Sequence, residues 1–211
     1  MKKKILGLIL ASLGMFSFAQ ARFFVGVEGG YTVGNFKGTA GDGKGFYASA
    51  FGPGLIADAF KNTNGYSAAL TLGSENFFGN YFGVRSAIFG GYTSVSYKSG
   101  SESSKTNLVD AGLNIDLMLN FFGNETSSFG VFGGAEAGYH YWLNKPSGLS
   151  TVGNNLVDFS GRVGISALMG GHHRIEILAK IPFASMGFKT TLGGSVVPLN
   201  VSVGASYKFV F

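Results

Sequence analysis

Eight segments of this chain alternate apolar and polar side chains, and a period of two is typical of β-strands that separate two environments. The clearest segment has Leu113, Ile115, Leu117, Leu119 and Phe121 on one face and Gly112, Asn114, Asp116 and Asn120 on the other. The other segments lie at 23–33, 66–73, 82–97, 129–141, 157–167, 175–183 and 197–211. In the third segment the phase changes near Ser94, which predicts a bulge. The pattern predicts an all-β fold.

The composition indicates where these strands lie. Charged residues make up 13% of the chain, against about 25% in a soluble domain. After residue 21 there is no apolar run of the roughly 20 residues that a membrane-spanning helix needs. A chain with few charges and no such run can still cross a membrane with alternating strands, which turn one face to lipid and the other to a polar lumen. Because an unpaired edge is not tolerated in hydrocarbon, the sequence predicts a closed, eight-stranded antiparallel transmembrane β-barrel.

The first residues predict export. Lys2, Lys3 and Lys4 precede an apolar stretch at 5–18, and an A-x-A cleavage motif follows, with Ala19 and Ala21 at its two alanine positions. We therefore expect a signal peptide at 1–21, cleaved after Ala21, and a barrel domain at 22–211. These three lysines carry most of the formal net charge of +5, and no basic cluster suggests nucleic-acid binding. The chain contains no cysteine, which excludes a lipoprotein anchor and a disulfide framework.

The connections between the segments alternate in length. Those at 74–80, 122–128 and 170–173 are short, and the four at 35–64, 98–106, 143–155 and 185–196 are longer or more polar. Short periplasmic turns and longer outer loops are the usual asymmetry of such barrels, so both ends of the barrel domain are expected in the periplasm.

A pentapeptide, Asn-Phe-Phe-Gly-Asn, occurs at 76–80 and again at 120–124. We interpret it as a repeated hairpin unit that places Phe77, Phe78, Phe121 and Phe122 at the membrane interface. The alternative is coincidence in a chain with 21 phenylalanines.

The charged side chains of the strands fall on the polar face and are expected in the lumen. They are Glu28, Arg85, Asp116, Glu136, Arg162, Glu176, Lys180 and Lys208. An eight-stranded barrel is only wide enough for side chains to fill, which favours an ion-pair network that plugs it. The alternative is a narrow channel lined by these charges.

No pattern predicts catalysis, a metal or a cofactor. The histidines are His140, at the outer end of a strand without a nearby serine nucleophile, and His172 and His173, adjacent in a turn. Two adjacent histidines without a third ligand make a poor metal site. Residues 38–45 imitate a phosphate loop, but Gly45 replaces the Ser or Thr that such a loop needs. Residues 54–61 are apolar enough for a short helix over the barrel mouth.

Two regions carry a resemblance to known proteins. The alternating end at Tyr207, Phe209 and Phe211 resembles the terminal strand signal that the outer-membrane barrel assembly machinery reads. Residues 172–182 and the start at 23–31 resemble the Helicobacter outer membrane protein family. The resemblance implies an integral outer-membrane protein surrounded by lipid and lipopolysaccharide.

The leading functional interpretation is a structural or surface-interaction barrel. The alternatives are a narrow porin-like channel and an adhesin for a host-cell surface, since large members of the family act as porins or adhesins. This chain lacks the long inserted domain of the large adhesins.

Overall fold

The computed structural model describes residues 21–40, 63–99, 102–124, 126–144, 155–186, 188–189 and 194–211. The predicted loop helix at 54–61, most of the phosphate-loop imitation at 38–45, and Ala19 lie outside these residues. The strands are β1 (Arg22–Ala40), β2 (Thr63–Phe78), β3 (Phe82–Ser99), β4 (Glu102–Gly123), β5 (Ser128–Asn144), β6 (Asn155–Met169), β7 (His173–Met186), β8 (Phe188–Lys189) and β9 (Gly194–Val210). In the described part of the chain, no helix has the length and hydropathy to span a membrane.

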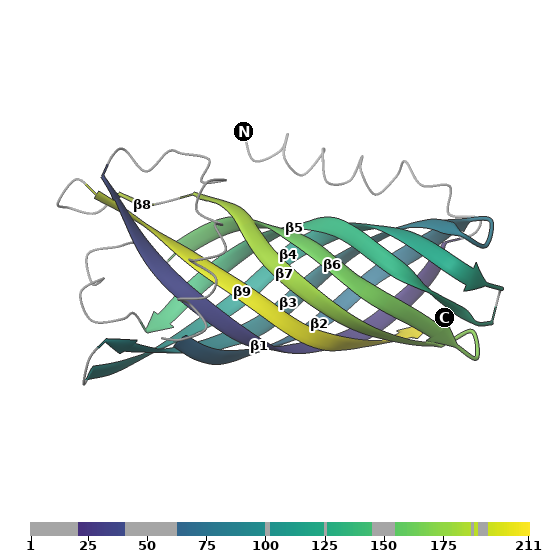
Figure 1. The fold of residues 1–211 in the computed structure, drawn as a ribbon, viewed down its shortest axis with the longest axis horizontal. Helices are drawn as coiled ribbons and strands as arrows, with labels where there is room; N and C mark the ends of the chain where they lie inside the picture. The colour runs from purple at the N-terminus through teal and green to yellow at the C-terminus, as the bar shows by residue number, and fades with distance from the viewer. Residues whose placement is uncertain are drawn as a thin grey trace.

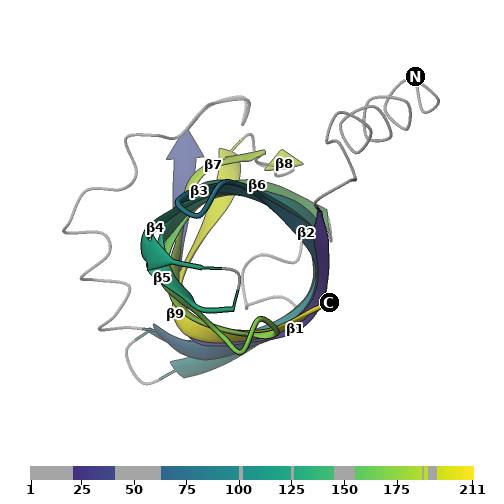
Figure 2. The ribbon, with the colours of Figure 1, turned by 90° about the vertical axis from the view of Figure 1, so that its right-hand side faces the viewer.

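The strands form one antiparallel sheet that closes on itself (Figures 1 and 2). Each strand from β1 to β7 pairs with its neighbour in sequence, β7 pairs with β9, and β9 pairs back with β1. This closing ladder runs from Phe24↔Val210 to Ala40↔Gly194. The two-residue β8 adds a short pairing to β9. The predicted eight-stranded barrel is confirmed.

One end of the barrel carries the three short turns and the ends of β1 and β9, and we call it the turn end (Figure 1). The opposite end, where the longer connections lie, is the loop end. Gly79, Gly170 and Gly171 adopt φ of 74°, 60° and 76° in two of the turns, a region that side chains with a Cβ rarely enter. The turns are short at one end and the connections long at the other, as predicted, and on this asymmetry we expect the turn end to face the periplasm.

The strands are longer than the sequence predicted. The predicted outer loop at 98–106 is largely paired strand, because the β3–β4 ladder continues to Ser99↔Glu102. Likewise, β1 continues to Ala40 and β9 begins at Gly194, inside two other predicted loops. Alternation of hydropathy marks only the part of a strand between lipid and lumen, whereas the hydrogen-bonded ladder continues where both faces are polar.

The predicted bulge near Ser94 is wrong. Strand β3 pairs in one unbroken register with β4 from Phe82 to Ser99. Val95 belongs to the inward-facing series and is completely buried, so its apolar side chain marks a lumen position rather than a change of phase. Register shifts occur instead between β4 and β5, near Leu108 and Phe122, and between β6 and β7, near Ser160.

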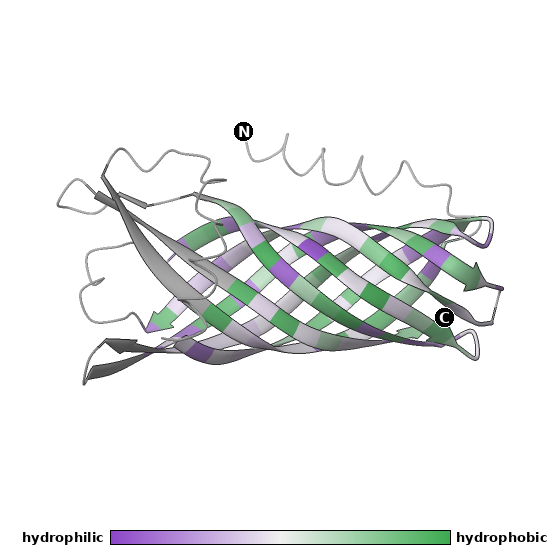
Figure 3. Ribbon diagram, viewed as in Figure 1, coloured by the Kyte–Doolittle hydropathy of each residue, from purple (hydrophilic) through white to green (hydrophobic). Residues whose placement is uncertain are grey.

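Apolar and polar residues alternate along the strands (Figure 3), so the two faces of the wall differ. Large apolar side chains stand exposed on the outer surface, where a soluble protein would bury them. Examples are Leu70, Ile88, Leu117, Val163 and Ile177. This outer surface is the one that acyl chains cover in a membrane.

Glycines make room for aromatic rings inside the barrel. A Cβ at Gly164 would lie 2.7 Å from ring atoms of Phe132, and a Cβ at Gly112 would lie 2.7 Å from ring atoms of Phe89. Both distances are shorter than real Cβ contacts allow. Inward glycines therefore let large rings of the adjacent strands pack against the wall and fill the lumen.

Candidate functional site

The predicted lumen charges lie together inside the barrel. We call Glu28, Arg85, Asp116, Glu136, Arg162, Glu176, Lys180 and Lys208 the central network. Its members come from seven strands and occupy the inward positions of each, because a period of two fixes the face of every residue once one is assigned.

One half of the central network is organised by Arg85. Its guanidinium binds the carboxylate of Asp116 at 2.7 Å and that of Glu176. Glu176 also binds the ammonium of Lys208, which donates to the hydroxyl of Ser206 at 2.5 Å. Arg85, Asp116 and Glu176 are all at most 1% exposed. Three strands that are not all neighbours are thus tied across the lumen.

The other half is organised by Arg162. Its guanidinium binds Glu136 and lies 3.3 Å from Glu28. Lys180 binds the same two carboxylates, with its Nζ 3.0 Å from the Oε2 of Glu136. Arg162 Nε lies 3.3 Å from Asp116 Oδ1, a charge contact outside hydrogen-bond geometry that joins the two halves.

The central network has four acidic and four basic side chains, linked without a break. Burial of charges is costly unless each is paired, and here every member has an opposite charge beside it. On the turn-end side, apolar groups continue the filling: the Arg85 guanidinium lies 4.8 Å from the ring centroid of Phe132, which packs with Met118 and Leu178. The middle of the lumen is therefore occupied.

A second cluster lies nearer the loop end. His140 lies between two aspartates, with Nδ1 2.6 Å from Asp110 and Nε2 3.1 Å from Asp158. The hydroxyl of Thr93 donates to the other oxygen of Asp110 at 2.6 Å. These residues and Lys180 line a cavity of about 70 Å³, too small for more than a few waters.

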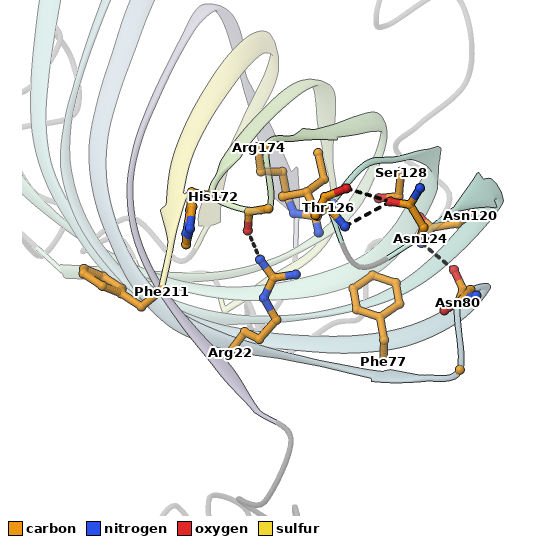
Figure 4. Close-up of a pocket in the computed structure, with 14 residues that line it drawn as sticks. Arg22, Phe77, Asn80, Asn120, Asn124, Thr126, Ser128, His172, Arg174 and Phe211 are labelled. Carbon is orange, nitrogen blue, oxygen red and sulfur yellow. Dashed lines mark hydrogen bonds between the residues drawn. The ribbon is translucent and has the colours of Figure 1, made fainter.

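A third group lies towards the turn end. Arg174 is fully buried, binds Glu75 at 2.9 Å and donates to the Ser166 hydroxyl at 2.9 Å. Beyond it, a hollow of about 680 Å³ opens at the turn end (Figure 4). We call this hollow the vestibule.

Three of the four phenylalanines predicted at the membrane interface lie on the outer surface, and the fourth lies inside the barrel. Phe78, Phe121 and Phe122 are exposed on the outer surface near the turn end. Phe122 would face inward by simple alternation, but the register shift between Asn120 and Phe122 puts it outside. Phe77 is not at the membrane interface, because it packs inside the barrel against the cluster of Met118, Phe132 and Leu178. The guanidinium carbon of Arg174 lies 5.8 Å from the centroid of its ring.

In the predicted terminal signal, Tyr207 and Phe209 lie on the outer surface of β9, and Phe211 follows the strand and lines the vestibule. The hydroxyl of Tyr207 is hydrogen-bonded to Nδ1 of His173 at 2.8 Å. The ring of Phe209 stacks on the imidazole of His172, with 5.6 Å between the ring centroids. The ring of Phe211 meets that of Phe209 edge-on. Ala21, the described member of the predicted cleavage site, directly precedes β1.

Sequence reasoning missed four charged residues of the lumen: Glu75, Asp110, Asp158 and Arg174. Glu75 and Asp110 lie outside the segments that alternation assigns to strands, and Arg174 adjoins a predicted turn. Asp158 lies on the predicted inward face but is not part of the predicted set of lumen charges. For His140, the sequence offers only the question of a catalytic base. A rule that extends each strand until a glycine turn would have found Glu75 and Arg174.

A comparison with protein families decides the relationship. A family profile described as Helicobacter outer membrane protein matches residues 69–211. The chain belongs to this family. The predicted family is thereby confirmed, and this member is an integral β-barrel of the outer membrane.

The chain is similar to several solved structures, three of which follow. OprG from Pseudomonas aeruginosa is 15% identical, with 90% of this chain and 97% of OprG covered and a TM-score of 0.46. Ail, the attachment invasion locus protein of Yersinia pestis, is 13% identical, with 90% and 100% covered and a TM-score of 0.39. The translocator domain of the autotransporter NalP from Neisseria meningitidis is 13% identical, with 100% and 95% covered and a TM-score of 0.29. No curated protein matches the chain.

Proposed function

We propose that this outer-membrane protein is a closed scaffold: a barrel that contributes to the envelope and presents its loop end at the cell surface, without conducting solutes. The observation that carries the proposal is the central network. Among the described residues, its buried ion pairs cross the lumen in the middle of the barrel, with the small loop-end cavity on one side and the vestibule on the other.

The filling is energetically self-consistent. Opening a path would separate charges such as Arg85 and Asp116, and a buried charge that loses its partner costs about 3–5 kcal/mol. An eight-stranded barrel has no spare diameter to move these side chains aside. A closed lumen is therefore the stable state expected of this wall and this filling.

We also propose that the protein is not an enzyme. Nucleophilic catalysis needs a base in contact with the nucleophile. The Thr93 hydroxyl donates to Asp110 rather than to the imidazole of His140. His172 Nδ1 contacts the carbonyl of Val210, and His173 contacts a surface tyrosine.

Biogenesis belongs to the same proposal. Residues 1–21 combine a basic start, an apolar stretch and an A-x-A motif, and this order supports export with cleavage after Ala21. The alternating aromatic end of the chain, Tyr207, Phe209 and Phe211, supports recognition by the barrel assembly machinery. Lipid and lipopolysaccharide are the partners expected of the exposed apolar wall.

Liposome swelling tests the proposal. Vesicles that contain the purified protein should swell no faster in an isotonic solution of a small uncharged sugar than vesicles without it. Swelling that increases with the amount of inserted protein would support the narrow channel instead.

A further inference from the structure

The vestibule has the size and shape of a ligand site. Its volume of about 680 Å³ falls within the usual range of about 300–1,000 Å³ for ligand pockets. It is walled by strand ends and by all three turns, so its lining is held by the barrel rather than by long loops (Figure 4). It is open to the side that we assign to the periplasm.

The charge of the vestibule favours an acidic ligand. Among the described lining residues the ionisable side chains are Arg22, His172 and Arg174, and Arg174 is already paired with Glu75, so Arg22 is the cation that can meet a ligand. Arg174 is held rigidly by Glu75 and Ser166. Arg22 lies nearer the opening and donates to the carbonyl of Gly171 in the β6–β7 turn (Figure 4). A guanidinium has five N–H donors, and this bond uses one of them.

The uncharged part of the lining is suited to a peptide or glycan. Asn124 accepts hydrogen bonds at its Oδ1 from the backbone of Thr126, at 3.0 Å, and of Ser127, at 2.8 Å. These bonds orient the amide, and its NH₂ group remains a donor. Asn80, Asn120 and Ser128 add further amide and hydroxyl groups. Such groups bind carbonyls and hydroxyls, and a planar guanidinium fork binds carboxylates.

We propose that the vestibule binds the carboxylate-bearing peptides of the cell-wall glycan. The periplasmic side places the opening beside that polymer, whose peptides combine carboxylates, amides and sugars. This inference rests on the proposed scaffold function and gives it a partner: the barrel is linked to the wall beneath the membrane. Arg22 binds the ligand carboxylate, and the turn amides bind the peptide backbone.

Titration calorimetry on the purified full-length barrel in detergent tests the site. The probe is a soluble disaccharide–peptide fragment of the cell wall, and the comparison is the same fragment with its carboxylates amidated. The acidic fragment should bind, and Arg22→Gln should weaken its binding by roughly tenfold or more, the usual effect of losing a charged hydrogen bond. Lys105→Gln, which removes an exposed cation at the loop end, is the matched control and should leave binding unchanged.

Three results would overturn the proposal: no binding of the acidic fragment, equal binding of the amidated fragment, or equal binding by R22Q. A separate measurement tests the side of the membrane. The chain has no cysteine, so Thr126→Cys provides a single label position at the vestibule. In intact cells it should be protected from an impermeant maleimide. Labelling there would exclude a cell-wall partner and still leave the closed lumen intact, which liposome swelling tests independently.

Discussion

Arg85 shows how single residues stabilise this barrel. Its guanidinium binds two carboxylates from β4 and β7 and stacks near Phe132 from β5, so one side chain joins four strands through the lumen. A barrel in lipid gains little by burying its outer face, since acyl chains are as apolar as the side chains. The specificity of the fold must then come largely from pairing and packing inside.

Replacing Arg85 by methionine should therefore strongly destabilise the folded barrel. The substitution preserves most of the volume but leaves Asp116 and Glu176 as buried acids without this partner. We expect a loss of about 3–5 kcal/mol in the free energy of unfolding. Urea unfolding in lipid vesicles, followed by the fluorescence of the only tryptophan, Trp142, measures it.

Lys105→Met is the control for this experiment, because Lys105 is an exposed cation of β4. It should change the unfolding free energy by less than about 0.5 kcal/mol. A loss below about 1 kcal/mol for Arg85→Met would show that the central network does not stabilise the barrel.

Among the eight strands that close the barrel, β7 has the shortest ladder to a neighbour, the one with β9. Its ladder with β9 runs only from His173↔Phe209 to Lys180↔Ser202, whereas β9 pairs with β1 along its whole length. Two features explain where the β7–β9 ladder stops. Pro182 has no N–H to donate, and the nearby register shift at Ser160 bends β7 relative to β6.

The consequence is a local difference in amide exchange within β7. Amides of Ile181–Met186 that are not used by the β6–β7 ladder should exchange on the order of a hundredfold faster than those of Ile175–Lys180. Nuclear magnetic resonance of the barrel in nanodiscs resolves the two halves. Uniform protection along β7 would mean that the ladder with β9 is complete.

The strands also show what sequence could and could not predict. Alternation assigned the eight members of the central network to one face, because a two-residue period relates all positions of a strand. It did not predict which charges meet: Arg85 and Glu176 are 91 positions apart and are joined by strand order and stagger, which have no local signal. It also failed at Glu75 and Phe77, which face inward in the part of β2 beyond the predicted segment 66–73.

At the scale of the whole molecule, the interior is arranged in layers along the barrel axis. The vestibule lies at the turn end, then the Arg174–Glu75 pair and the apolar residues, then the central network, and the His140 cluster lies nearest the loop end. The same strands therefore form the membrane-embedded wall and supply the side chains that fill the lumen.

Single-channel recording in a planar lipid bilayer tests the occupied lumen most directly. Protein whose insertion is verified by protease protection should give no discrete current steps above the bare bilayer across moderate voltages. Reproducible steps of constant amplitude from the unmodified protein would contradict a lumen closed by the central network.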